Sequence, residues 1–151
     1  MVTERLKEIA ELTVQYAAKQ KVDQAQVSAF LVDSALTRFA NSQIHQNVAE
    51  KSGGVAIKVI LNKKISTIRV GTLEEEDIKK AVVEAVKLAK VSSPNKDFKS
   101  LPEPEPWNPI KGVFDEETAN CVPKYRAEKV KEAIETAHSK SPSVKAVAGY
   151  F

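Results

Sequence analysis

The side chains that most often carry hydrolytic metal chemistry are scarce in this sequence, which has two histidines, His45 and His138. A catalytic zinc site needs three protein ligands and an open position for water. Its common helical form places two histidines one turn apart with a glutamate between them. Neither histidine has such neighbours, because Gln46-Asn47-Val48-Ala49 follows the first and Ser139-Lys140 follows the second. We therefore assign no metal ligand and no catalytic residue within this chain.

Cysteine chemistry is also poorly supported. The only cysteine, Cys121, excludes an internal disulfide and any CxxC metal or redox site. It lies just before Pro123, where a helix is expected to begin. Nucleophilic activity would need a histidine base held beside the thiol. A small apolar residue packed at a helix start is the favoured interpretation.

Composition narrows the class of protein. The 151 residues are 42% hydrophobic and 28% charged, which suits one soluble domain or two small ones. No run approaches the roughly 20 apolar residues that span a membrane, and the N-terminus lacks the apolar block of a signal peptide. The net charge of +3 comes from basic residues spread along the chain. We expect a cytoplasmic protein that binds neither membrane nor, directly, nucleic acid.

Three segments have the apolar spacing of amphipathic helices: residues 4–19, 74–90 and 123–138. Thr72 followed by Glu75 predicts a capping box before the second helix. Pro123 is suited to the first turn of the third helix.

Four segments between the first two helices have the pattern of strands: residues 24–32, 37–48, 55–61 and 65–71. Within the second, Phe39 and Ile44 differ in parity, so a bulge or break near Asn41-Ser42 is needed to place both on one face. Ser52-Gly53-Gly54 and Asn62-Lys63-Lys64 are predicted turns. Short links favour an antiparallel meander, so the predicted fold is α+β: about four strands covered by two to three helices.

The remaining segments suggest three parts: a helix–sheet–helix core over residues 1–100, a Pro-rich crossing over 101–122, and a helix and strand over 123–151. Prolines from Pro102 to Pro109 predict an extended, stiff crossing. The last residues, 144–151, have the pattern of a strand that opens toward Gly149-Tyr150-Phe151. Because an uncovered apolar strand is an aggregation hazard, we expect a missing C-terminal region or a covering partner.

Several stretches, in this order and spacing, resemble the N-terminal domain of the TldD/PmbA family. The resemblance runs roughly from Val22 to the end, and the Ser92-Ser93-Pro94 segment looks closer to the PmbA-type subunit. The stretches that carry it are Leu36–Gln46, Gly54–Val59, Thr72–Ile78, Ala85–Lys90, Ser92–Phe98 and Leu101-Pro102.

The resemblance implies that this chain is part of a zinc metallopeptidase. Members of that family are also described as modulators of DNA gyrase. Such proteins form homo- or heterodimers that cut unfolded peptides. Their zinc motif lies in the C-terminal part, outside this chain, and PmbA-type relatives lack the zinc ligands. The implied function is therefore a non-catalytic N-terminal domain that acts as scaffold, dimerisation surface and guide for unfolded peptide substrates, with no cofactor of its own.

A sheet edge can hold an extended peptide through backbone hydrogen bonds that do not depend on its sequence. The polar strand around residues 38–46 is the candidate for this contact, through Arg38, Asn41, Gln43 and His45. An ordinary solvated strand is the simpler structural interpretation. The alternative function, from a different class, is a free-standing small binding module unrelated to proteolysis.

Overall fold

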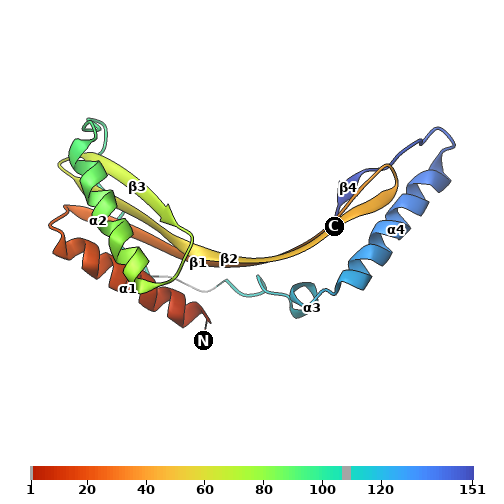
Figure 1. Ribbon diagram of the computed structural model, residues 1–151, viewed down its shortest axis with the longest axis horizontal. Coiled ribbons are helices and arrows are strands. Elements are labelled where there is room, and N and C mark those ends of the chain that lie inside the picture. Colours follow the sequence, from red (N-terminus) through yellow and green to blue (C-terminus); the bar gives the residue numbers. More distant parts are fainter. Residues whose placement is uncertain (1, 107–109) are drawn as a thin grey trace. The chain divides into compact units, whose positions relative to one another are not determined.

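The computed structural model describes residues 2–106 and 110–151 and has an α+β fold, as the sequence predicts (Figure 1). One sheet has the strand order β3-β2-β1-β4. The elements are α1 (Val2–Lys19), β1 (Gln24–Ala40), β2 (Gln43–Leu61), β3 (Lys64–Val70), α2 (Glu75–Val91), α3 (Glu116–Ala119), α4 (Pro123–Lys140) and β4 (Gly149–Tyr150). No helix in the described ranges is long and apolar enough to cross a membrane.

The chain divides into two units, each built from two stretches of sequence. The first unit comprises Met1–Val32 and Lys51–Pro104, and the second comprises Asp33–Glu50 and Glu105–Phe151. Strands β1 and β2 each contribute residues to both units.

The first unit holds the larger hydrophobic core. Helices α1 and α2 pack against each other, and α2 packs on β3 (Figure 1). Val55, Ile57 and Val59 alternate along β2 and are fully buried, as strand geometry requires for one face. They meet the apolar stripe of α2 that the sequence predicts, including Val82 and Ala85. Burying each valine or isoleucine contributes about 1.5–3 kcal/mol.

The predicted strands 24–32 and 37–48 are wrong as separate elements, because β1 runs without interruption through Gln24–Ala40. Ser52-Gly53-Gly54 is likewise no turn but part of β2. The glycines serve a different purpose there. A Cβ on Gly54 would clash with the carbonyl oxygen of Val70, and one on Gly53 would lie 2.8 Å from Leu31 Cδ1. Glycine is required at Gly54 because β3 approaches closely.

Two short hairpin turns define the strand ends. Asn41 and Ser42 have φ of 51° and 60°, and Asn62 and Lys63 have φ of 52° and 61°. Two consecutive residues with positive φ are typical of the type I′ turn, whose twist matches that of the strands. The break expected near Asn41-Ser42 is therefore a complete chain reversal.

The three predicted helices are confirmed, but the predicted capping box is wrong. Helix α2 begins after Glu74, whose side chain makes no capping hydrogen bond. Thr72 lies two residues before that position, and its hydroxyl instead accepts a bond from the Glu74 N–H at 3.0 Å. Thr72 thus stabilises the turn that leads into the helix.

In the second unit, Pro123 occupies the first turn of α4 and Ser141 ends the helix. The predicted strand over 144–151 is mostly wrong, since β4 is limited to Gly149 and Tyr150, which lie opposite Phe39 and Arg38 of β1. Residues 101–106 have no regular structure, and the unpredicted short helix α3 follows in the same crossing. Part of the predicted Pro-rich run, residues 107–109, lies outside the described residues.

Candidate functional site

The four residues predicted to contact a peptide lie around the turn between β1 and β2, in the second unit. Arg38 is on β1, Asn41 is in the turn, and Gln43 and His45 are on β2. All four side chains are exposed. They are therefore accessible to a ligand, although they belong to two strands with different surroundings.

The outer edge of β1 at Arg38 is already paired. Tyr150 of β4 lies opposite Arg38. Beside this pair, the Thr37 N–H donates to the Phe151 carbonyl at 3.0 Å, and the Phe151 N–H donates to the Thr37 carbonyl at the same distance. A peptide could add to this edge only by displacing β4.

The outer edge of β2 differs. Its partner β3 pairs only with Val55–Leu61. Among the described residues, no strand lies against the outer edge of β2 from Gln43 to Glu50. Backbone groups on such an edge remain available to an added strand.

A buried polar cluster connects α4 to this hairpin. Arg126 is 4% exposed, and its Nε donates to Thr37 Oγ1 at 3.2 Å. Its Nη1 donates to the Cys121 carbonyl at 2.6 Å, and its Nη2 donates to Asn47 Oδ1 at 3.1 Å. The Thr37 hydroxyl donates to the same Asn47 oxygen at 3.2 Å. The arginine therefore holds the helix start and both strands together through neutral acceptors.

The sequence analysis did not identify Arg126. One signal was present: Arg126 lies four residues before Val130, so it shares the apolar face of the predicted helix. A charged residue at such a position is expected to have buried hydrogen-bond partners.

The two histidines have separate roles. His138 Nε2 lies 2.8 Å from Ser42 Oγ and so links the end of α4 to the hairpin turn. His45 is exposed on β2. In residues 2–106 and 110–151, no group of three His, Cys, Asp or Glu side chains is placed to hold a metal ion.

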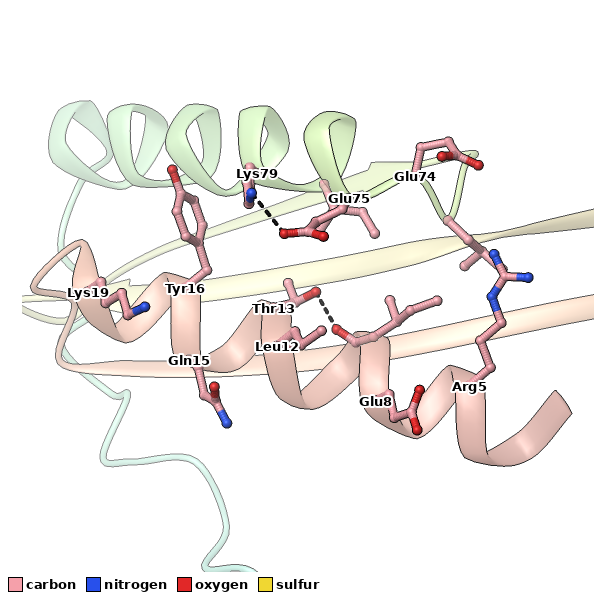
Figure 2. A pocket seen from close by; sticks show the side chains of 13 residues that line it. Arg5, Glu8, Leu12, Thr13, Gln15, Tyr16, Lys19, Glu74, Glu75 and Lys79 are labelled. Carbon is pink, nitrogen blue, oxygen red and sulfur yellow. Dashed lines mark hydrogen bonds and ion pairs between the residues drawn. The ribbon is translucent and has the colours of Figure 1, made fainter. Parts of the chain in front are cut away.

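A pocket of about 580 Å³ lies between α1 and α2 in the first unit (Figure 2). Figure 2 shows side chains from both helices facing it, among them Tyr16 and Thr13 of α1. The Thr13 hydroxyl donates to the Ile9 carbonyl at 2.6 Å. Lys79 and Glu75, both on α2, form an ion pair at 2.8 Å.

These polar contacts within the pocket are ordinary ones for helices. The hydrogen bond from Lys79, with its positive charge, lowers the pKa of the Glu75 carboxyl, and the bonds to Glu75 and Glu76 raise the pKa of Lys79. Both groups are thereby kept charged at neutral pH, which is the opposite of what proton transfer requires. We therefore place the candidate site at the hairpin of the second unit.

Comparison with known proteins gives a family match and several structural matches. Residues 32–89 match the family model described as PmbA/TldA metallopeptidase domain 1. Curated protein sequences give no match.

Solved structures similar to the chain include TldE from Thermococcus kodakarensis, with a TM-score of 0.79 and 23% identity over 94% of this chain and 32% of that one. A candidate modulator of DNA gyrase from Bacteroides thetaiotaomicron has a TM-score of 0.76 and 19% identity over 99% of this chain and 35% of its own. Another candidate modulator of DNA gyrase, from Thermotoga maritima, has a TM-score of 0.69 and 22% identity over 94% of this chain and 31% of its own. The chain thus spans about a third of the length of these structures and has the fold of that third.

Proposed function

We propose that this chain is an N-terminal domain of the PmbA/TldD family, and that it is the non-catalytic N-terminal part of a cytoplasmic metallopeptidase, of the PmbA type. In this role it acts as scaffold, dimerisation surface and guide for unfolded peptide substrates. The observation that carries the proposal is the family match over residues 32–89, together with a shared fold over nearly all of the chain.

The non-catalytic assignment is supported by the chemistry of the described residues. His45 is exposed on a strand, whereas His138 contacts Ser42. Zinc, where a catalytic relative uses it, would be held by the C-terminal part of that protein and would there activate a water molecule.

A dimerisation role is supported by apolar side chains on β1. Phe30, Leu31 and Val32 are consecutive and are 38%, 51% and 46% exposed. Because adjacent side chains of a strand point to opposite faces, apolar surface is accessible on both faces of β1 there. Contiguous exposed apolar surface is typical of protein interaction sites.

The guiding role is supported by the unpaired outer edge of β2. Backbone hydrogen bonds along a sheet edge bind an extended chain with little regard for its sequence, whereas a folded protein seldom presents such a segment. A domain with this edge is suited to receive unfolded substrates.

The test is a binding measurement with an unfolded polypeptide. We expect the purified chain to raise the fluorescence anisotropy of labelled, reduced and alkylated casein, and to leave that of labelled native lysozyme unchanged. Its mass by light scattering should correspond to a dimer or larger assembly. Equal binding of both probes, or binding of neither, would contradict the guiding role.

The non-catalytic assignment has its own measurement. We expect no cleavage of the labelled casein by the chain alone, with or without added zinc. Cleavage that a chelator abolishes, together with one zinc ion per chain by elemental analysis, would refute it.

A further inference from the structure

Helix α4 carries a stripe of charged side chains beside a hollow in the second unit. The stripe consists of Lys124, Glu128, Lys131 and Glu135, which follow one another at intervals of four, three and four residues. At about 100° per residue, these positions lie within about 60° of one another around the helix axis. All of them line the hollow of about 590 Å³ at the end of the β1–β2 hairpin, and their side chains are 61–86% exposed. The stripe is therefore accessible to a partner.

The contacts that the stripe makes within the chain are weak ones. Lys124 lies 3.9 Å from Glu128 and Lys131 lies 3.7 Å from Glu135, whereas an ion pair elsewhere on the same helix is 2.7 Å long. In both stripe pairs the lysine precedes the glutamate, an order that stabilises a helix less than the reverse. Exposed pairs of this kind contribute little to stability. Exchanging them for contacts to a partner therefore costs α4 little.

The order of charges along the stripe is self-complementary. A second copy of the helix that runs antiparallel presents the opposite charge at every position. A two-fold axis midway between Glu128 and Lys131 places Lys124 opposite Glu135 of the second copy, and Glu128 opposite Lys131 of the second copy. The symmetry repeats both contacts, as in any two-fold interface. A parallel copy in register would instead place like charges together.

The antiparallel arrangement also brings apolar side chains together. Ala127 and Ile134 of α4 line the hollow, and so does Ile44 of β2. Ile44 is 42% exposed, and the other two are half-buried. With the same two-fold axis, Ile134 of one copy and Ala127 of the other differ in height by about 3 Å along the helices. Side chains at that separation are in contact, so each copy covers part of the hollow of the other.

A second copy complements the hollow better than a ligand of one charge. The two lysines and two glutamates of the stripe sum to zero, so a uniformly acidic or basic partner would meet as much repulsion as attraction. A complementary partner is a helix with the inverse order of charges, and α4 supplies that order when it is reversed.

We propose that two copies of this chain associate through antiparallel α4 helices, with ion pairs between the stripes and Ile134 of each copy beside Ala127 of the other. This inference rests on the proposed dimerisation role. It adds to that role a second surface, since the exposed apolar side chains of β1 at Phe30, Leu31 and Val32 belong to the first unit.

The test is sedimentation equilibrium of the full chain. We expect a monomer–dimer equilibrium that is weaker in 0.5 M sodium chloride than in low salt, because exposed ion pairs are screened. Lys124→Glu and Glu135→Lys each turn two attractive contacts of the dimer into repulsive ones. Each change should raise the dissociation constant of the dimer about fivefold or more.

Combining the two changes distinguishes a contact between chains from an effect within one chain. Residues 124 and 135 are about 16.5 Å apart along α4, too far for their side chains to pair in one chain. An equimolar mixture of Lys124→Glu and Glu135→Lys restores opposite charges across the two-fold axis, and so does a chain that carries both changes. We expect both to recover the original dissociation constant to within twofold. Recovery in the mixture also shows that each variant is folded.

The matched controls are Glu132→Lys and Lys140→Glu. They make the same changes of charge at exposed positions of α4 that do not line the hollow. We expect each control to stay within twofold of the original chain, with no tighter association when the two are mixed. Tighter association of the mixed controls would mean that net charge, in place of the stripe, drives the recovery.

The outcomes separate this inference from the proposed function. A dimer that neither salt nor the single changes weaken would refute the α4 surface and leave the dimerisation role to β1. Weakening by Lys124→Glu and Glu135→Lys without recovery in their mixture would also refute it. A chain that stays monomeric at every concentration would contradict the dimerisation role itself.

Discussion

Replacing Arg126 by methionine should destabilise the second unit by about 2–3 kcal/mol. A hydrogen bond to a charged group contributes about 1.5–3 kcal/mol, so losing the three that Arg126 donates would suggest roughly 5–9 kcal/mol. Two effects make the loss smaller. Asn47 is exposed and Cys121 is half-buried, so water can replace the guanidinium at both. Methionine also avoids the cost of burying a charge that has neutral partners, about several kcal/mol.

What remains is the loss at Thr37, which is fully buried. Its hydroxyl still donates to Asn47 but loses the N–H that it accepts from Arg126. An unsatisfied buried acceptor costs about 1–3 kcal/mol, and imperfect packing of the methionine adds to it. The sum gives the expected 2–3 kcal/mol.

Native-state hydrogen exchange provides the assay, because the Thr37 and Phe151 amides are paired with each other's carbonyls. A loss of about 2–3 kcal/mol should make both exchange roughly 30- to 150-fold faster. Amides of α2, in the first unit, should be much less affected. Lys124→Met is the control, since that side chain is 86% exposed on the same helix.

The opposite result has a clear meaning. Replacing buried charged groups with apolar ones is sometimes neutral or stabilising. If Arg126→Met leaves the exchange of Thr37 and Phe151 unchanged or slower, the desolvation cost exceeds the value of the three hydrogen bonds. The assignment of Arg126 as the residue that holds α4 to the hairpin would then be refuted.

Three further predictions concern the first unit. Gly54→Ala should lower Tm by about 4–8 °C, a loss of roughly 2 kcal/mol, because the added Cβ would meet the Val70 carbonyl. Gly71→Ala is the control: a Cβ added there would have no atom within 4 Å, so the Tm should not fall in this way. Ser66→Ala should lower the free energy of unfolding in urea by about 1–2 kcal/mol, because Ser66 Oγ donates to the Ala85 carbonyl in a buried position. Ser93→Ala, at an exposed position, is the control, and a smaller loss of stability for Ser66→Ala than for this control would contradict the prediction. Lys79→Met should return the lowered pKa of Glu75 to near 4.5 in an NMR titration. Since that pKa is lowered in the folded state, the stabilisation that the Glu75–Lys79 pair gives the fold is complete above pH 4.5 and is lost as pH falls through the lowered value. A Glu75 titration that the substitution leaves unchanged would exclude Lys79 as the cause of the shift.

The helices could be predicted because their apolar spacing persists over four or more turns. In α2, Ile78, Val82 and Ala85 follow the helical period and are buried as expected. The positions at which the strands begin and end were harder to predict from the sequence. Gly53 and Gly54 have the composition of a turn, yet their absent side chains accommodate neighbouring strands, and a contact between residues as distant as Gly54 and Val70 leaves no local pattern.

The candidate site was predictable only in part. The polar residues near Asn41 do lie around one hairpin end, but which edge is open depends on where β3 and β4 pair. The pairing of Gly149 and Tyr150 with β1 spans more than a hundred residues, and the Arg126 cluster needs α4 beside β1 and β2. Such long-range contacts are set by packing, which periodicity in one sequence does not reveal.

The interleaving of the two units limits where this chain can be divided. A fragment that stops at residue 104 retains Asp33–Glu50 but loses every other part of the second unit. Phe39, which lies beneath Gly149, would then become accessible to solvent, and the outer edge of β1 would lose its partner β4. Shortened versions intended for crystallisation or fusion should therefore precipitate unless α4 and the residues after it are kept.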